Sequence, residues 1–389
     1  MRAGTYIKQA SDYRAFIPAS LPPNPPINYD SELSLLLSKA DRCMGRLDGV
    51  TTVLPNPDLF VAMYVKHEAV LSSQIEGTQS TLEDILQYEI DANTSEIPQD
   101  VEEVVNYVRA MNHGIRRLPE LPLSLRLIRE IHKELMHGVR GENRSPGEFR
   151  QSQNWIGSAG STISNATFIP PPVHEMQKAL GDLENFLHDN SHPVLIQCAL
   201  AHAQFETIHP FLDGNGRVGR LLITFLLCER EILHRPLLYL SYYLKAHRAE
   251  YYDRLMAVRN QGNWEDWIKF FLRGIIEVSQ SATDTARKIL ALQENHRRQI
   301  IAEVGGRSSN SLKLLDSLYE TPITGIKNVE KQLQITFQTA NNLINQFVTL
   351  GIMKERTGQK RNRVFVYQPY LDLFNKPVIE MNEETPLIR

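Results

Sequence analysis

The stretch His209-Pro-Phe-Leu-Asp-Gly-Asn-Gly-Arg-Val-Gly-Arg220 decides the fold that we expect for this chain of 389 residues. An apolar run, Leu221 to Cys228, follows it directly and predicts a buried helix. The turn Gly214-Asn215-Gly216 therefore lies just before a helix N-terminus. Because glycine allows left-handed backbone, successive N–H groups can converge there on an anion, and the helix end adds partial positive charge. The stretch thus predicts a phosphate-binding turn.

Four side chains in the same stretch add chemistry to this turn. Arg217 and Arg220 are three residues apart, so we expect them to share a helix face and to reach a polyphosphate together. Asp213 is a hard oxygen ligand of the kind that Mg²⁺ prefers. His209 precedes a proline, which predicts extended backbone outside the helix, where its imidazole could take a proton from a hydroxyl. The patterns GxxxxGK[ST] and HExxH are absent from the sequence, which argues against an ordinary nucleoside triphosphatase and a zinc protease.

The stretch resembles the signature of Fic-domain proteins, HPFx[DE]GNGRxxR, with every fixed position filled. The resemblance implies a mainly α-helical Fic core with a small β-hairpin flap, and transfer of AMP from ATP to a protein hydroxyl. It also implies that His209 is the general base and that Asp213 holds Mg²⁺ against the phosphates. The ATP-binding residues that it implies around the turn are His209, Gly214, Asn215, Gly216, Arg217, Val218, Gly219 and Arg220.

A second motif lies upstream, in Ser72-Ser-Gln-Ile-Glu-Gly77. A helix predicted from Pro57 onward ends here, with Gly77 as its left-handed stop, and Ser80 to Glu83 read as a capping box that begins the next helix. Glu76 then meets the negative end of the helix dipole, a contact that costs about 0.3–1 kcal/mol. A cationic partner is therefore expected.

The spacing of Ser72, Glu76 and Gly77 is similar to the inhibitory motif [ST]xxxE[GN] of the same family. The resemblance implies that Glu76 pairs with Arg220 at the ATP site. A paired Arg220 is unavailable to the γ-phosphate, so ATP would bind in an unproductive pose.

Two further segments are interpreted with the help of the family. Residues 143–172 predict a loop with a small hairpin, similar to the flap on which a target segment docks, and the candidate flap side chains are Ile156, Ile163 and Phe168. The region after Pro236 is similar to the one that closes over adenine, with Tyr243, His247 and Tyr251 as candidates. His202 is interpreted as a core histidine, not as a metal ligand.

The remaining sequence predicts the domain order. Residues 1–30 are proline-rich and predict an extended N-terminal arm; residues 31–120 form an N-terminal helical region with the inhibitory helix, and residues 121–300 form the catalytic core. A linker rich in Gly and Ser follows at 305–310. Residues 307–389 predict a helix-turn-helix and a basic hairpin, which resembles a winged helix. Between residues 310 and 370 the chain has eight basic and four acidic side chains, which mildly favours binding of a polyanion.

Composition sets outer bounds. Apolar residues make up 42% of the chain and charged residues 22%, as in ordinary globular proteins, and the net charge of −3 argues against a chain that is basic throughout. Three scattered cysteines suit neither a disulfide scaffold nor a zinc site. These few cysteines fit a reducing cytoplasm best, so we predict a cytoplasmic protein. Neither a signal peptide nor a membrane span is expected, and no membrane partner is predicted.

The leading prediction is an adenylyltransferase that uses ATP and Mg²⁺, modifies an unknown target protein and itself, and is held off by Glu76. Transfer of phosphate or phosphocholine stays open, because relatives vary the donor. Removal of AMP by a water that Glu76 positions also stays open. The alternative of another class is a nucleotide-sensing regulator that binds DNA through the winged helix. Protein docking through that module and a homodimer are further partners left open.

Overall fold

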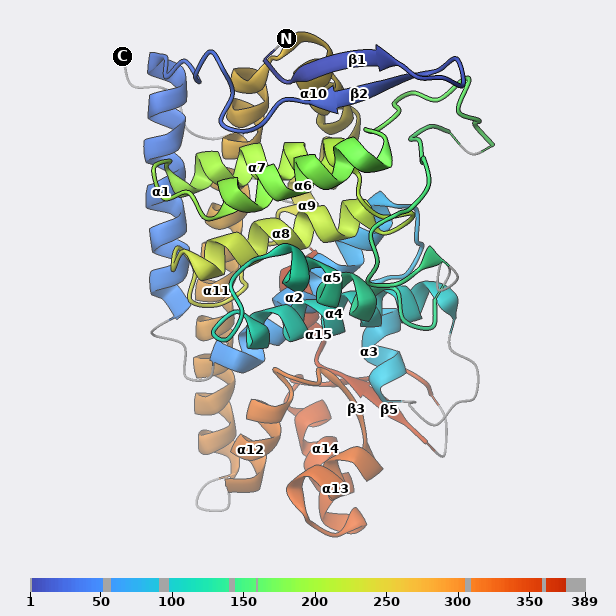
Figure 1. Ribbon diagram of the computed structural model, residues 1–389. Helices are drawn as coiled ribbons and strands as arrows, with labels where there is room; N and C mark the ends of the chain where they lie inside the picture. The colour runs from blue at the N-terminus through green and yellow to red at the C-terminus, as the bar shows by residue number, and fades with distance from the viewer. Residues whose placement is uncertain are drawn as a thin grey trace. The chain divides into compact units, whose positions relative to one another are not determined.

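The computed structural model describes residues 2–51, 57–90, 98–139, 144–158, 160–304, 309–358 and 362–375 (Figure 1). The chain divides into two compact units. The core unit comprises Met1–Asp48, Tyr64–Ser80 and Ile97–Ser279; the C-terminal unit comprises Gly49–Met63, Thr81–Glu96 and Gln280–Arg389. Helices dominate both units and the sheets are small and antiparallel, as the sequence predicts.

Helices supply nearly all of the regular structure in the described part of the core unit. They lie at α1 Ser31–Thr51, α2 Pro57–Ile75, α4 Gln99–Arg117, α5 Leu125–Leu135, α6 Val173–Leu187, α7 Val194–Ile208, α8 Asn215–Glu229, α9 Ser241–Ala246, α10 Arg248–Gln261 and α11 Trp264–Val304. Residues 49–51 of α1, 57–63 of α2 and 280–304 of α11 belong to the C-terminal unit.

The centre of the core unit is α7, in which every residue from Leu195 to Ile208 is buried. A helix that is apolar on nearly all faces must be surrounded by other elements. Figure 1 shows α6 and α8 beside it, and both pack on α7. The buried helix predicted after the signature is α8, and its N-terminus lies next to the C-terminal end of α7 because only residues 209–214 connect them.

The predicted N-terminal arm contains two paired strands. Strands β1 Gly4–Lys8 and β2 Arg14–Pro18 form an antiparallel hairpin, in a register from Gly4 opposite Pro18 to Lys8 opposite Arg14. Phe16 is fully buried, and its N–H donates to the Ile169 carbonyl over 2.9 Å. Strand β2 packs on α7, so the hairpin closes one side of the core (Figure 1).

In the C-terminal unit, α12 Ser309–Ser317, β3 Ile323–Gly325, α13 Ile326–Leu333, α14 Phe337–Thr349, β4 Lys354–Glu355, β5 Val364–Val366 and α15 Gln368–Asn375 follow one another. The strands form an antiparallel sheet in the order β3-β5-β4. The sequence predicts three helices and two strands here, but β3 is too short to show an alternating pattern. The predicted linker at 305–310 lies mostly outside the described residues.

The C-terminal unit also includes a segment from the N-terminal half of the chain. Helix α3, Leu82–Ile90, packs on β3, and Glu83 forms a 3.0 Å ion pair with Arg356. The capping box that begins α3 is one residue later than predicted. The Thr81 hydroxyl accepts from the Asp84 N–H over 3.2 Å, while the Asp84 carboxylate accepts from the Thr81 N–H over 2.8 Å.

No helix in the described ranges combines the length and the apolar content that a membrane span requires.

Candidate active site

The predicted phosphate-binding turn lies at the N-terminus of α8. Gly214 is the N-cap residue, with a left-handed φ of 75°, so the glycine is required there. The Asn215 side chain holds the turn from inside, because it accepts from the Phe211 N–H and donates to the Phe211 carbonyl, both over 2.8 Å. A first helical turn has backbone N–H groups without intrahelical partners, and this turn therefore presents them in a fixed arrangement.

His209 is the C-cap of α7, with φ 49° and ψ 62°. The prediction of extended backbone was wrong, because the left-handed conformation lets the His209 carbonyl accept from Arg150 Nε over 3.0 Å and from Asn154 Nδ2 over 3.2 Å. Burial, with the positive charges of Arg259 and Arg150, lowers the pKa of His209 to about 3. The imidazole is therefore neutral, as a general base must be.

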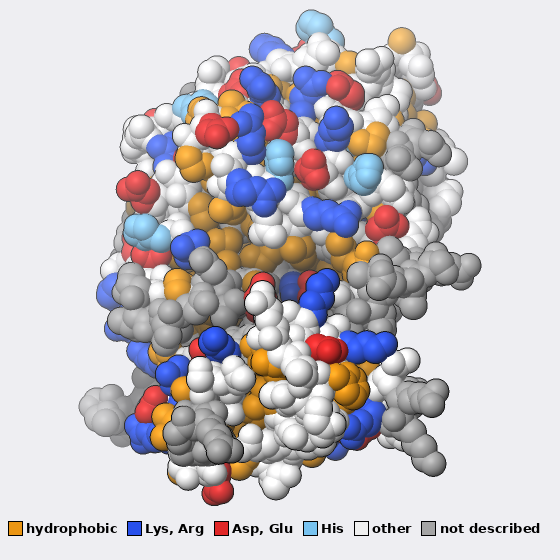
Figure 2. All heavy atoms as spheres, turned by 90° about the horizontal axis from the view of Figure 1, so that it is seen from below, with side chains coloured by type: hydrophobic (Ala, Val, Ile, Leu, Met, Phe, Trp, Pro, Cys, Tyr) orange, Lys and Arg blue, Asp and Glu red, His pale blue; other side chains and the backbone are white. Residues whose placement is uncertain are grey.

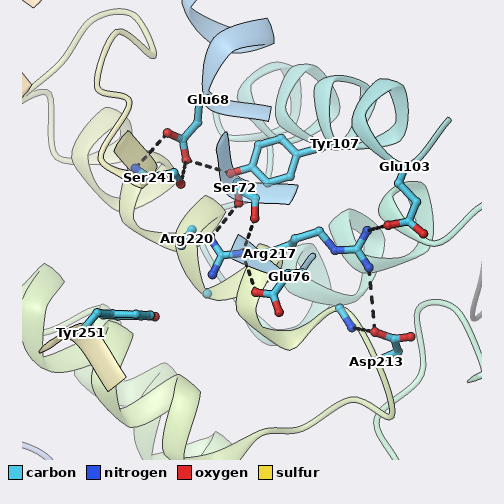
Figure 3. A network of polar contacts seen from close by, with 12 residues as sticks. Glu68, Ser72, Glu76, Glu103, Tyr107, Asp213, Arg217, Arg220, Ser241 and Tyr251 are labelled. Atoms are coloured by element: carbon cyan, nitrogen blue, oxygen red, sulfur yellow. Dashed lines mark hydrogen bonds and ion pairs between the residues drawn. The ribbon is translucent and has the colours of Figure 1, made fainter. Parts of the chain in front are cut away.

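Arg220 is bound by the predicted inhibitory segment (Figure 3). Its Nε donates to Ser72 Oγ over 2.7 Å, and its Nη2 donates to the Ser72 carbonyl over 2.9 Å and to Glu76 Oε1 over 2.7 Å. The Arg220 side chain is 2% exposed and that of Glu76 35%. Burial opposes ionisation of Glu76, but Arg220 outweighs it and holds the Glu76 pKa below its usual range.

The Glu76 carboxylate also lies against the phosphate-binding turn. A Cβ added to Gly216 would collide with Glu76 Oε1, so this position accepts only glycine while Glu76 is in place. Glu76 therefore places a negative charge in the first turn of α8, where the helix end favours an anion. Gly77 ends the segment with a φ of 107°.

Arg217 does not join Arg220. Its Nη1 lies 3.3 Å from Glu103 Oε2 and its Nη2 lies 3.9 Å from Asp213 Oδ1, so the two guanidiniums are paired with different carboxylates (Figure 3). For Arg217 and Arg220 to bind one polyphosphate together, at least Arg220 must release Glu76. Arg217 already lies in the first turn of α8.

Asp213 is the candidate Mg²⁺ ligand. Its carboxylate accepts from the Gly214 N–H over 2.6 Å and keeps 44% of its side chain exposed. Within the described residues, no group of three or more His, Cys, Asp or Glu side chains forms a protein-only metal site. One exposed carboxylate nevertheless fits Mg²⁺, which is usually held by one or two carboxylates together with substrate phosphates and water.

Val218 and Gly219, predicted at the ATP site, face the interior. Val218 is 1% exposed, and a Cβ on Gly219 would collide with the Glu206 carboxylate. The Gly219 carbonyl lies 2.8 Å from His202 Nδ1, and His202 Nε2 lies 2.9 Å from the Tyr251 hydroxyl. His202 therefore packs against the N-terminal part of α8 on its buried side and is a core histidine, as predicted.

The three candidates for the adenine site are not equivalent. Tyr243 and Tyr251 are buried at 6% and 1% exposure, whereas His247 is exposed and its ring centroid lies 4.4 Å from that of Tyr243. Figure 3 shows Tyr251 apart from the contacts that join Arg220 to Glu76. His247 is therefore the candidate with a free surface.

Among the described residues of the predicted flap, Ile156 and Phe168 form an antiparallel bridge. Ile156 and Ile163 are half-buried, but Phe168 is 2% exposed. The Arg259 guanidinium lies 4.0 Å from the centre of the Phe168 ring, and Phe16 packs beside it. Phe168 therefore belongs to the core and does not present its side chain to a docked segment.

The sequence did not single out the buried carboxylates Glu68, Glu103 and Glu206. Glu206 is 6% exposed, and its Oε1 has no hydrogen-bond partner among the described residues. Burial raises its pKa to about 7, although Arg220 and Arg259 act in the opposite direction. A glutamate inside the apolar run of α7 was the signal that could have identified it.

Two family matches cover most of the core unit. Residues 34–116 match the family described as Fic/DOC family N-terminal, and residues 122–227 match the Fic/DOC family. A solved Fic family protein from Desulfovibrio desulfuricans G20 has the same fold, with a TM-score of 0.56 at 18% identity over 88% of this chain and 97% of that one.

Curated relatives match a shorter part of the chain. The protein adenylyltransferase Fic of Aedes aegypti is 32% identical over 152 residues, which are 38% of this chain and 27% of the relative. A probable protein adenylyltransferase of Aquifex aeolicus is 29% identical over 182 residues, 45% of this chain and 51% of the relative. The chain thus spans between about a quarter and a half of these relatives. With the signature and both family matches in place, this chain contains a Fic/DOC family domain at residues 122–227, preceded by the N-terminal region of that family at residues 34–116.

Proposed function

We propose that this chain transfers AMP from ATP to a hydroxyl side chain of a target protein, and to itself, and that Glu76 holds the reaction off. One observation carries the proposal: a neutral His209 and the N-terminus of α8, with Arg217 and Arg220 in its first two turns, adjoin the same short loop. The names of the relatives agree with this activity. The cytoplasm, where we expect the protein, supplies ATP.

In the proposed reaction the backbone N–H groups of the first turn of α8, from Asn215 onward, bind a phosphate of ATP, and Arg217 adds a positive charge beside them. The target hydroxyl oxygen attacks the α-phosphorus in line, its proton passes to His209, and pyrophosphate leaves. The ring must be neutral to accept this proton, as its burial ensures. Positioning and electrostatic stabilisation supply most of the rate in such transfers.

Asp213 would hold Mg²⁺ beside the phosphates, and the ion would neutralise part of their charge. Arg217 Nη2 lies 3.9 Å from the Asp213 carboxylate and would keep it next to the turn when no ion is bound. The exposed part of Asp213 is the part that such an ion would approach.

Inhibition follows from the two positions of the Glu76 carboxylate. It neutralises Arg220, and it lies against Gly216 in the first turn of α8. ATP would therefore meet a negative charge where its distal phosphates need a positive one. We propose that ATP binds in an unproductive pose until Glu76 moves.

The test compares purified wild type, Glu76→Gly and His209→Ala, each incubated in parallel with α-labelled and γ-labelled ATP, followed by mass spectrometry. AMP transfer predicts α label on protein in Glu76→Gly, little in the wild type and none in His209→Ala. Label from γ-labelled ATP instead would favour phosphate transfer. If pre-labelled protein loses AMP only while Glu76 is present, removal of AMP is the dominant activity.

A second candidate function is DNA binding through the C-terminal unit. The exposed face of α14 carries Gln338, Asn342 and Asn345, and Asn and Gln side chains can make paired hydrogen bonds with adenine in the major groove. Between residues 310 and 370 eight basic residues stand against four acidic ones, so any electrostatic attraction to DNA is modest. Figure 2 shows both basic and acidic side chains on the face seen from below. This function would be favoured if the chain binds a DNA duplex in a salt-sensitive manner and Asn342→Ala weakens that binding. The assays with labelled ATP should then produce no labelled protein.

A further inference from the structure

Helix α2 and the turn directly after it present three polar side chains at intervals of four residues: Glu68, Ser72 and Glu76. Residues four apart lie on one face of a helix. Figure 3 shows Ser72 and Glu76 joined to Arg220, and Glu68 joined to Ser241 and Tyr107. Ser72 and Glu76 bind Arg220, but Glu68 does not. Glu68 lies two helical turns from Glu76 and is only 4% exposed, so its buried carboxylate must be stabilised by partners other than Arg220.

The Glu68 carboxylate accepts hydrogen bonds from two other segments of the core unit. The Ser241 N–H donates to Oε2 over 3.1 Å, the Ser241 hydroxyl donates to Oε1, and the Tyr107 hydroxyl donates to Oε1 over 3.3 Å. Ser241 begins α9 and Tyr107 lies on α4. Burying a carboxylate is costly, so these donors fix where Glu68, and with it α2, must lie.

Tyr107 connects this contact to Arg220. Its hydroxyl also interacts with the side chain of Ser72, and Ser72 Oγ accepts from Arg220 Nε. Burial raises the pKa of Glu68 to about 7, so its carboxylate is ionised above that pH. Arginine has only donors and an ionised carboxylate only acceptors, so the two ends then set the direction of every hydrogen bond between them. Arg220 donates to Ser72, Ser72 can donate to Tyr107, and Tyr107 donates to Glu68.

We propose that Glu68 is a positioning residue for autoinhibition: it anchors α2 to Ser241 and Tyr107, so that Ser72 and Glu76 stay on Arg220. This inference rests on the proposed function, because it concerns the inhibition of the same site. Without the hydrogen bonds of Glu68, α2 is held less firmly, so the contacts of Ser72 and Glu76 with Arg220 should break more often. Loss of the anchor should therefore release part of the inhibition that Glu76→Gly releases completely.

Glu68→Gln is the sharpest variant, because it keeps the shape of the side chain but places an amide N–H group toward donors. Ser241→Ala removes one donor from the other side and carries the test if Glu68→Gln does not fold, as thermal unfolding will show. Val70→Ala is the matched control, since it removes buried volume from the same helix without touching the polar contacts.

Two measurements are made on the full chain. Hydrogen exchange of the amides at 72–77 should be at least about threefold faster in Glu68→Gln and Ser241→Ala than in Val70→Ala, because the anchor is lost. Self-modification from α-labelled ATP should rise about three- to tenfold in the same two variants. In a Glu76→Gly background Glu68→Gln should add nothing, because the inhibition is already gone.

Unchanged hydrogen exchange in both variants overturns the anchor, whatever the transfer assay shows. A rise in Val70→Ala as large as in Glu68→Gln also overturns it, since any loosening of α2 would then suffice. If exchange rises as expected but Glu76→Gly produces no labelled protein, the anchor stands and the proposed function fails. If Glu76→Gly is active and Glu68→Gln is not, the inference alone fails.

Discussion

Arg220 Nη2 and Glu76 Oε1 are 2.7 Å apart, and this ion pair joins α8 to the C-terminal end of α2 (Figure 3). The residues are 144 positions apart in the sequence. The same carboxylate oxygen touches Gly216, in the first turn of α8. A single carboxylate thus occupies both the arginine and the helix end that a phosphate would need.

His209→Ala, made in the Glu76→Gly background, should reduce AMP transfer by about 100-fold or more, because a general base is lost. ATP binding should persist, since the α8 turn and both arginines remain. Transfer is measured with α-labelled ATP and binding by calorimetry. His174→Ala, an exposed histidine on α6, is the matched control and should leave both unchanged. Near wild-type transfer in His209→Ala would remove His209 from the reaction.

The His209 imidazole should remain neutral well below its ordinary pKa. Its pKa is lowered to about 3, so the neutral ring contributes stability above pH 6.5 that is lost as the pH falls toward 3. Glu76 raises this pKa, so Glu76→Gly should lower it further. Imidazole ¹⁵N chemical shifts should report a neutral ring at pH 5. A titration midpoint near 6.5 would show that the ring is solvated and that the buried geometry is wrong.

Glu206→Gln should change how stability depends on pH. The Glu206 pKa is raised to about 7, so its contribution to stability is present below about pH 4.5 and is lost as the pH rises through 7. Glutamine does not ionise, so the variant should gain stability relative to wild type between pH 5 and pH 7.5. Urea unfolding at both values measures this difference, and a difference that does not change with pH would contradict the raised pKa.

Phe168→Ala should destabilise the protein by about 3–5 kcal/mol, because it leaves a cavity under Arg259 and beside Phe16. Ile163→Ala, in the same loop but only half-buried, should cost about 1 kcal/mol or less. Urea denaturation compares the two variants. If both variants lose little stability, the Phe168 side chain is not part of the core and belongs to the flap, as the sequence predicted.

Local patterns predicted much of the fold and of the site. The apolar run after Gly216 predicted α8, and the poor dipole position of Glu76 predicted a cationic partner, which is Arg220. Both follow from residues within one or two helical turns. The family resemblance supplied the identity of the partner, which no local pattern contains.

What could not be predicted depends on partners far along the chain. The left-handed His209 needs Arg150 and Asn154, which come 59 and 55 residues earlier. Arg217 turns to Glu103, 114 residues away, and so leaves Arg220. Glu68 looked like one more helix residue, because its three donors lie on α4 and α9. Hydrogen bonds between distant side chains leave no periodic signal in the sequence.

The most direct test of the account is the rate of self-modification from α-labelled ATP in Glu76→Gly, compared with wild type and with the double variant Glu76→Gly, Arg220→Ala. Freeing Arg220 removes one charge-assisted pair, so the rate should rise on the order of tenfold or more. The double variant should lose that gain, because Arg220 is what Glu76 withholds. If Glu76→Gly is no faster than wild type with several candidate targets present, Glu76 does not inhibit the enzyme.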